Sequence, residues 1–319
     1  MPPVKAPVQA PANATRAGRA EASATQGRPG DGLGPNPGRW RTGPSTLRLL
    51  QFTDLHLYAE PGAVLLGQCT RRTFEQVLAQ ARTRHWPADA ILFTGDLVHD
   101  ERVEGYRYLR RIIDALDCPC FCIPGNHDRR ELLAAEVDPG AGQAYRVEPL
   151  GPWDLVLLDS TIAGADGGRL PPATLARLEQ QLATNQQRPA LVSVHHQPVA
   201  VGSRWIDTMR IENGAELLAL AERYPRLRAI LWGHVHQAFD QAFGATRLLA
   251  TPSTCAQFKP VSEHFALDDL PPGYRWLELE PDGRLRTGVE RLATAAPRAD
   301  PGGATASASA VSQDRQRSG

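Results

Sequence analysis

Short apolar runs alternate with segments of helical periodicity along most of this 319-residue sequence. The apolar runs are no longer than seven residues and are bounded by polar or turn-forming residues, as is typical of strands buried in a sheet. They are Leu47–Phe52, Ala90–Thr94, Cys118–Ile123, Trp153–Asp159, Ala190–Val194, Arg228–Trp232, Arg247–Thr251 and Tyr274–Glu280.

Between these runs, apolar residues recur at spacings of three and four, which predicts amphipathic helices. The alternation of strands and helices indicates an α/β domain built in layers. Strands are dense in the C-terminal third, which favours a second sheet over one long doubly wound sheet. We therefore expect a four-layer αββα sandwich, with helices on both outer faces. The helical positions are Phe74, Val77, Leu78 and Ala81; Leu175, Leu178 and Leu182; and Leu217, Leu218 and Ala221.

The two ends of the sequence differ from its centre. Residues 1–44 and 294–319 are rich in Pro, Ala and Gly and have no apolar periodicity. Such segments bury too little surface to offset their ordering entropy, so we expect both to be disordered around a single domain at 45–293. No run approaches the ~20 apolar residues of a membrane-spanning helix, and the N-terminus lacks the apolar region of a standard signal peptide. These features predict a soluble protein without a membrane partner, and leave a targeting role of the leader open.

Charge and cysteine content narrow the functional classes. Residues 45–293 contain 26 basic and 31 acidic residues, an acidic balance that disfavours a nucleic-acid partner. The five cysteines are an odd number, which favours reduced thiols and a cytoplasmic location. Cys118, Cys120 and Cys122 alternate as residues on one face of a strand do. We interpret them as buried structural cysteines, because a zinc site needs other spacings and a second half.

Five of the predicted strands end in clusters of Asp, Asn and His. These clusters contain or directly precede seven of the nine histidines. Carboxyl ends of strands form sites in open α/β sheets, so the clusters are expected to meet at one edge. The clusters are Asp54-Leu55-His56, Gly95-Asp96, Gly125-Asn126-His127-Asp128, His195-His196 and Gly233-His234-Val235-His236.

Taken singly, most of these clusters have a plain structural interpretation. An Asp-x-His or Gly-Asp sequence after a strand is usually a turn, and His195-His196 alone is compatible with a structural pair. Together and in this order, they predict a metal site. Imidazole suits Mn, Fe and Zn, and carboxylate or amide oxygens suit harder ions. A carboxylate shared by two ions ~3.5–4 Å apart would allow a bridging hydroxide to act as nucleophile at neutral pH.

The five clusters resemble the motif blocks of the calcineurin-like metallophosphoesterase superfamily, over roughly residues 47–290. The resemblance implies two divalent ions, with Fe and Mn favoured and Zn and Co as alternatives. It implies a non-ligand catalytic histidine, His127, oriented by Asp128, and it alone selects His195 over His196. It also implies that His56, Asp96, Asn126, His127 and His236 contact substrate. The implied ligands are Asp54, His56, Asp96 and His236 for one ion, and Asp96, Asn126, His195 and His234 for the other.

Segments outside the metal motifs resemble the bacterial class III 3′,5′-cyclic-AMP phosphodiesterases. They are Trp205–Asn213, Leu248–Phe258 and Pro271–Leu279. The implied reaction is hydrolysis of cyclic AMP to 5′-AMP through the metal-bridging hydroxide, with His127 as proton donor. The alternative is a metallophosphoesterase of broader specificity, acting on other cyclic nucleotides, phosphodiesters or phosphomonoesters. His99, Trp205 and Phe258 are weak candidates for stacking on the base. The oligomeric state is left open.

Overall fold

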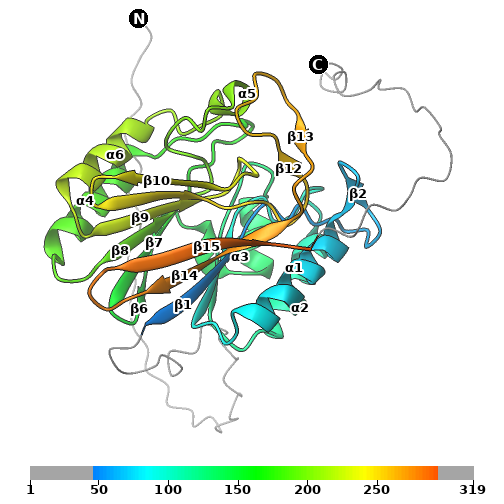
Figure 1. Cartoon of the computed structure of the whole chain (residues 1–319), viewed down its shortest axis with the longest axis horizontal. Coiled ribbons are helices and arrows are strands. Elements are labelled where there is room, and N and C mark those ends of the chain that lie inside the picture. The colour runs from blue at the N-terminus through cyan, green and yellow to red at the C-terminus, as the bar shows by residue number, and fades with distance from the viewer. Residues whose placement is uncertain (1–45, 294–319) are drawn as a thin grey trace, which may run out of the picture. The chain divides into compact units, whose positions relative to one another are not determined.

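Two β-sheets pack face to face in the computed structural model of this chain, which describes residues 46–293 (Figure 1). The segments 1–44 and 294–319, expected to be disordered, lie outside the described residues. The first sheet has the strand order β15-β14-β1-β4-β5 and the second has the order β10-β11-β9-β8-β7-β6. Their bounds are β1 (Leu47–Phe52), β4 (Ala90–Thr94), β5 (Cys120–Ile123), β14 (Gly273–Leu279) and β15 (Leu285–Arg291); and β6 (Tyr145–Leu150), β7 (Trp153–Leu158), β8 (Ala190–Ser193), β9 (Leu227–Trp232), β10 (Phe239–Phe243) and β11 (Thr246–Ala250).

Helices cover the outer face of each sheet, which confirms the four-layer αββα sandwich. Two short hairpins and one 3-10 turn complete the described chain. The first sheet is covered by α1 (Thr70–Arg84), α2 (Val103–Asp114) and α3 (Arg130–Glu136); the second by α4 (Pro172–Thr184), α5 (Arg204–Asp207) and α6 (Gly214–Arg223); the hairpins are β2 (Val64–Leu65) with β3 (Gln68–Cys69) and β12 (Gln257–Phe258) with β13 (Leu267–Asp268); the turn is η2 (Pro139–Gly142).

Strand β1 shows how the sequence builds these layers. Successive side chains of a strand point to opposite faces. Leu47 and Leu49 accordingly join the apolar cluster between the two sheets, whereas Leu50 and Phe52 join the cluster beneath α1 and α2. Both faces of the strand are buried, so its sequence is a continuous apolar run rather than an alternating one.

The parallel pairing of the central strands aligns their carboxyl ends. In the first sheet β1 pairs with β4, and β4 with β5, all in parallel. In the second sheet β7, β8, β9 and β11 are parallel neighbours. The loops that leave β1, β4, β5, β8 and β9 at these ends carry the five predicted clusters of metal-binding residues.

Two buried polar side chains tie the sheets together near this edge. Gln51 of β1 donates from Nε2 to the carbonyl oxygen of Trp232 in β9 at 3.1 Å, and to Thr94 Oγ1 at 2.8 Å. Arg275 of β14 donates from Nη2 to the carbonyl of Ala250 in β11 at 2.7 Å. Burial lowers the pKa of Arg275 to about 10. These bonds fix the position of one sheet's loops against those of the other.

Cys118, Cys120 and Cys122 lie on one side of the first sheet, as predicted, but only Cys122 is fully buried. Cys122 is buried beneath the helices of the first sheet, and Cys118 and Cys120 pack against the same apolar cluster but are only half-buried. Strand β5 begins at Cys120, so Cys118 precedes it. All five cysteines are free thiols.

We expect Gln51→Leu to lower the free energy of unfolding by about 2 kcal/mol, measured by urea denaturation, because it leaves buried partners without their hydrogen bonds. The exposed residue Gln76 in α1 provides a matched control. Gln76→Leu should change the same quantity by less than about 0.5 kcal/mol. Equal unfolding midpoints for the two variants would contradict the proposed tie between the sheets.

Candidate metal centre

Hydrogen bonds join the loops that follow β1, β4, β5, β8 and β9, some between backbone groups and some from a backbone amide to a carboxylate. The Asp54 amide donates to the Gly95 carbonyl at 3.0 Å, and the His56 amide to the Asp96 carbonyl at 2.8 Å. The Gly233 amide donates to the His195 carbonyl at 3.1 Å, which joins the β9 loop to the β8 loop. The His234 amide donates to the Asp54 carboxylate at 3.0 Å, and the His127 amide to Asp96 Oδ1 at 3.0 Å, so the loops of both sheets form one connected rim. It brings together Asp54, His56, Asp96, Asn126, His195, His234 and His236.

Five of these seven residues have a left-handed backbone. Their φ values are 52° at Asp54, 46° at His56, 53° at Asp96, 63° at His234 and 49° at His236. This region is uncommon for residues other than glycine, and each such residue costs on the order of 1–3 kcal/mol unless the surroundings compensate. Strained backbone gathered at one rim indicates a functional site.

Two glycines allow the loops to approach this closely. A Cβ on Gly125 would lie 2.1 Å from Asp96 Oδ1, and a Cβ on Gly233 would lie 2.0 Å from Thr53 Oγ1 and 2.6 Å from Asp54 Oδ2. Any side chain at either position would displace a carboxylate of the rim. The glycines that precede Asn126 and His234 are therefore required by packing; neither has a positive φ.

Asp96 lies at the centre of the arrangement. Its Oδ1 atom is 3.4 Å from His195 Nε2, and its Oδ2 atom is 3.7 Å from His56 Nε2. The same Oδ1 accepts a hydrogen bond from the His127 amide at 3.0 Å. The carboxylate thus faces two groups of candidate ligands, one on each oxygen.

Two of the histidines have a defined tautomer in the neutral state. His236 donates from Nδ1 to the Ala256 carbonyl at 2.8 Å, and His195 donates from Nδ1 to the Thr94 carbonyl at 2.8 Å. A carbonyl only accepts, so the proton is on Nδ1 and the Nε2 atom carries a lone pair. Carbonyl partners of this kind orient metal-binding histidines.

The lone pairs face other potential ligand atoms, two of them oxygen acceptors. His236 Nε2 is 3.2 Å from His56 Nε2 and 3.4 Å from Asp54 Oδ1. His195 Nε2 is 3.2 Å from Asn126 Oδ1. Acceptors that face one another are unfavourable unless positive charge lies between them. The donor set therefore fits divalent cations, with one group of ligands on each side of Asp96.

His234 completes the set. Its ring is buried and its Nε2 atom has no hydrogen-bond partner among the described residues. The backbone amide of His234 donates to both oxygens of Asp54 at 3.0 Å, which fixes the β9 loop against the β1 loop. Burial lowers the pKa of His234, so the ring is neutral and able to bind a metal ion.

The protonation states of Asp96 and His195 are coupled. Burial alone would raise the pKa of Asp96, but the neighbouring His195 and His127 lower it well below its usual range. Burial alone would lower the pKa of His195, yet the Asp96 charge and hydrogen bond raise it to about 9. A proton on His195 can thus supply positive charge beside Asp96. A metal ion bound there would supply positive charge to all of the surrounding acceptors.

His196 lies next to His195, but both of its ring nitrogens are engaged. Nε2 is 3.2 Å from the Asp166 carbonyl and Nδ1 is 2.8 Å from Ser160 Oγ. Burial, with the nearby His195, lowers the pKa of His196 to about 3. A ring with both nitrogens in hydrogen bonds has none left for a metal ion, which supports His195 over its neighbour.

His127 stands at the edge of the rim and is half-buried. Its ring stacks on His99 at a centroid distance of 4.9 Å and lies edge-on to His56 at 5.2 Å. The His99 ring in turn places Nδ1 at 3.1 Å from His56 Nδ1. His99 therefore supports two residues of the rim, and its role in stacking on the base stays a prediction.

Asp128 has a different position from the one implied by the resemblance. Its carboxylate accepts hydrogen bonds from the backbone amides of Leu97, Val98 and Gly125, at 2.9–3.1 Å, and from the hydroxyl of Tyr106 at 3.2 Å. Burial, together with the Asp96 charge, raises its pKa to about 6. None of its hydrogen bonds in the described structure reaches the His127 ring. Asp128 holds the loops that carry Asp96 and Asn126, rather than orienting His127.

The aromatic ring of Phe258 packs against the rim, a contact that the sequence did not predict. Phe258 stacks on His236 with ring centroids 4.0 Å apart and an interplanar angle of 7°. Trp205 lies edge-on to Phe258 at 5.2 Å. The sequence does not reveal the Ala256 carbonyl that orients His236, because every residue has a backbone carbonyl.

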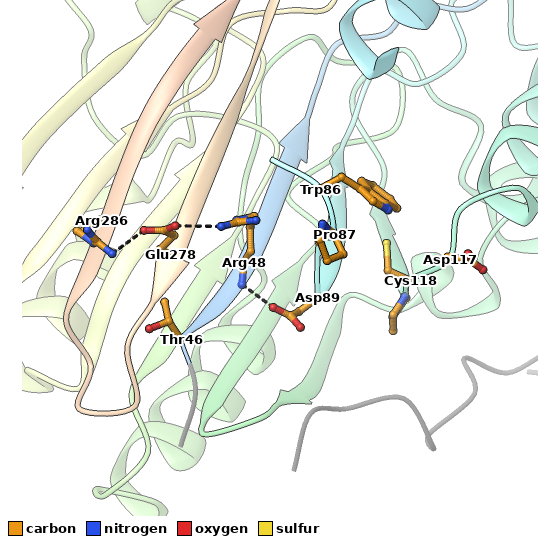
Figure 2. A pocket seen from close by; sticks show the side chains of 11 residues that line it. Thr46, Arg48, Trp86, Pro87, Asp89, Asp117, Cys118, Glu278 and Arg286 are labelled. Atoms are coloured by element: carbon orange, nitrogen blue, oxygen red, sulfur yellow. Dashed lines mark hydrogen bonds and ion pairs between the residues drawn. The ribbon is translucent and has the colours of Figure 1, made fainter. Parts of the chain in front are cut away.

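A cavity at the other end of the strands is chemically different. It has a volume of about 520 Å³ and is lined by residues at the amino ends of β1, β4 and β5. Glu278 lies between Arg48 and Arg286, at 3.3 and 2.8 Å, and Asp89 accepts from the Arg48 amide (Figure 2). Both of its arginines are paired with Glu278. The candidate metal-binding groups of the described residues all lie at the opposite, carboxyl ends.

No helix in residues 46–293 is both long and apolar enough to span a bilayer.

Known proteins resemble this chain in sequence. The model of the calcineurin-like phosphoesterase family matches residues 47–238. The chain is 43% identical over 248 residues to the 3′,5′-cyclic adenosine monophosphate phosphodiesterase CpdA of Pseudomonas aeruginosa, covering 78% of this chain and 91% of that protein. It is 39% identical over 252 residues to the protein of the same name from Escherichia coli (strain K12), covering 79% and 92%.

Solved structures share the fold at low sequence identity. A dimetal phosphatase from Danio rerio superposes with a TM-score of 0.56 at 13% identity, covering 77% of this chain and 99% of that one. A purple acid phosphatase from yellow lupin gives a TM-score of 0.52 at 14% identity, covering 77% and 54%. Both support the two-sheet architecture.

Gly125→Ala should reduce bound metal to less than half of the wild-type content, measured by elemental analysis after reconstitution, because the new Cβ collides with Asp96. Gly62→Ala is the control, since a Cβ there has no atom within 4 Å and the backbone has no positive φ. Full metal content in Gly125→Ala would contradict the close-approach argument.

Proposed function

The chain belongs to the calcineurin-like phosphoesterase family, and on this basis we propose that it hydrolyses 3′,5′-cyclic AMP to 5′-AMP with two divalent metal ions. One observation carries the proposal. Relatives that are 38–43% identical and aligned over about nine-tenths of their own length are named as cyclic AMP phosphodiesterases. Hydrolysis with two metal ions requires a group of ligands for each ion, and the acceptor groups on either side of Asp96 can provide both.

The proposed ligands form two groups that share Asp96. Asp54, His56 and His236 bind one ion with Asp96, and Asn126, His195 and His234 bind the other. Bound there, two divalent cations would activate a water molecule as nucleophile and stabilise charge on the phosphate. Fe and Mn are the metals we favour, with Zn and Co as alternatives, because mixed His, Asp and Asn sites accept all four.

The chain's own residues bind the substrate and move a proton. We place the cyclic phosphate against His56, Asp96, Asn126, His127 and His236, at the rim where their side chains meet. The oxygen of the activated water forms a bond to phosphorus while the bond from phosphorus to the 3′ oxygen breaks. Protonated His127 donates its proton to that 3′ oxygen, which leaves as the ribose hydroxyl. The His127 amide bonded to Asp96 and the ring stacked on His99 hold the donor in place.

The remaining expectations follow from this assignment. Cyclic AMP is a small-molecule partner, and the acidic balance of residues 45–293 disfavours a nucleic-acid partner. Five free thiols are compatible with the cytoplasmic location that we propose. One catalytic domain at 45–293 would carry all the chemistry.

A substrate panel separates this proposal from the broader-specificity alternative. With the Mn-reconstituted protein, kcat/KM should be at least about tenfold higher for cyclic AMP than for bis(p-nitrophenyl) phosphate, because only the nucleotide offers a base and ribose to bind. Hydrolysis of p-nitrophenyl phosphate should be weaker than either. A preference for the monoester would favour a phosphomonoesterase.

His127 and Asp96 should fail in different ways. His127→Ala should retain both metal ions and lower kcat for cyclic AMP by about 10²–10⁴-fold, the usual contribution of a general acid. Asp96→Ala should lose metal as well as activity. The exposed Gln180 on the outer helix α4 provides a control, and Gln180→Ala should keep both. Equal metal loss in the His127 and Asp96 variants would refute the separate roles.

A further inference from the structure

Three aromatic side chains extend away from the metal centre, beginning at His236. Phe258 stacks on His236 with ring centroids 4.0 Å apart, and Phe265 lies edge-on to Phe258 at 5.4 Å. Trp205 of α5 lies edge-on to both phenylalanines, at 5.2 Å from each. We name Trp205, Phe258 and Phe265 the aromatic wall. It is continuous with the proposed ligands through the Phe258–His236 stack.

Phe265 lies in the loop between β12 and β13, which begins after Phe258 and lies beside α5, the helix that carries Trp205 (Figure 1). Ser203, just before α5, hydrogen-bonds the Lys259 carbonyl at 3.4 Å, and the Lys259 amide donates to the Ala266 carbonyl at 2.8 Å. The tip residue, Val261, has a φ of 52° and is 81% exposed. A β-branched residue in left-handed backbone is a true outlier, and such strain gathers at functional sites.

Phe265 is unusual for an aromatic residue in a packed cluster. Its side chain is 50% exposed, whereas His236 beneath Phe258 is almost fully buried. One side of the Phe265 ring contacts the wall and the rest is free. Packing among the three rings covers only about half of the Phe265 side chain, so the rest of the ring is available to a ligand.

The wall also contains an unused hydrogen-bond donor. Trp205 Nε1 is buried and has no partner among the described residues. Buried indole N–H groups are normally bonded. Because this nitrogen is buried, it is not open to a ligand. The surface left for a ligand is the exposed part of the Phe265 ring, which suits a flat aromatic group.

We propose that the aromatic wall binds the purine of the nucleotide, with Phe265 stacking on the base. This inference rests on the proposed function for the placement of the phosphate at the metal centre. With the phosphate held there, the ribose bridges the distance from His236 past Phe258 to Phe265. Phe265 is then a specificity-determining residue: it contacts the base, at a distance from the bond that breaks.

The test compares two ligands that differ only in the base. Isothermal titration calorimetry measures the Kd of 5′-AMP and of ribose 5-phosphate with the full chain loaded with Mn²⁺. Phe265→Ala should weaken 5′-AMP binding about tenfold, as expected for loss of one base–aromatic stack, and leave ribose 5-phosphate binding within about twofold. Phe265→Trp should restore 5′-AMP binding.

Leu270→Ala is the matched control, because Leu270 is apolar, 48% exposed and close in sequence but outside the wall. It should leave the Kd of both ligands within about twofold. Equal weakening of both ligands by Phe265→Ala would show a structural role and overturn the proposal, as would unchanged 5′-AMP binding, which would leave the exposed ring as a contact for another protein.

The outcome is separable from that of the proposed function. Cyclic AMP turnover by the wild-type chain tests the proposed function alone. The wild-type chain could fail to hydrolyse cyclic AMP while Phe265→Ala still weakened binding of 5′-AMP and not of ribose 5-phosphate. That result would support the aromatic wall and overturn only the assigned reaction.

Discussion

The structure depends on the charge around one buried carboxylate. Asp96 presents each of its oxygens to a different histidine, His195 on one side and His56 on the other. The lone pairs of His195 and His236 are directed inward because backbone carbonyls hold the opposite nitrogen of each ring. Such a concentration of acceptors in a buried place is unfavourable by itself. Cations between the acceptors convert the same geometry into a favourable one, so folding and metal binding are coupled at this rim.

The rest of the fold maintains this arrangement. Parallel pairing aligns the strand ends within each sheet, and Gln51 and Arg275 hold the two sheets in fixed relation. Left-handed backbone at five of the seven proposed ligands turns their side chains towards one point, and the glycines at 125 and 233 leave room for the carboxylates. The Asp128 carboxylate accepts hydrogen bonds from backbone amides of the loops that carry Asp96 and Asn126. The strain at the rim is offset by apolar burial in the three surrounding clusters.

Most strands of the two large sheets could be predicted from the sequence. Strands buried on both faces, such as β1 and β4, appear as apolar runs with bounds that the sequence predicted. The strands of these sheets that were missed, β6, β10 and β15, lie at sheet edges, where polar residues and Pro149 obscure the pattern. The edge strand β5 is an apolar run and was predicted, whereas the two short hairpins were not. At the site, side chains in strand-end clusters were identifiable. Contacts made by a backbone carbonyl, such as that of Ala256, or by residues distant in sequence, such as Phe258 and Phe265, required the fold.

A crystal structure of the Mn-loaded chain with anomalous scattering data measures the central claim most directly. The account predicts two anomalous peaks ~3.5–4 Å apart, with one oxygen of Asp96 bound to each ion or one oxygen shared between them. A single peak, or a pair of peaks with Asp96 bound to neither, would contradict it.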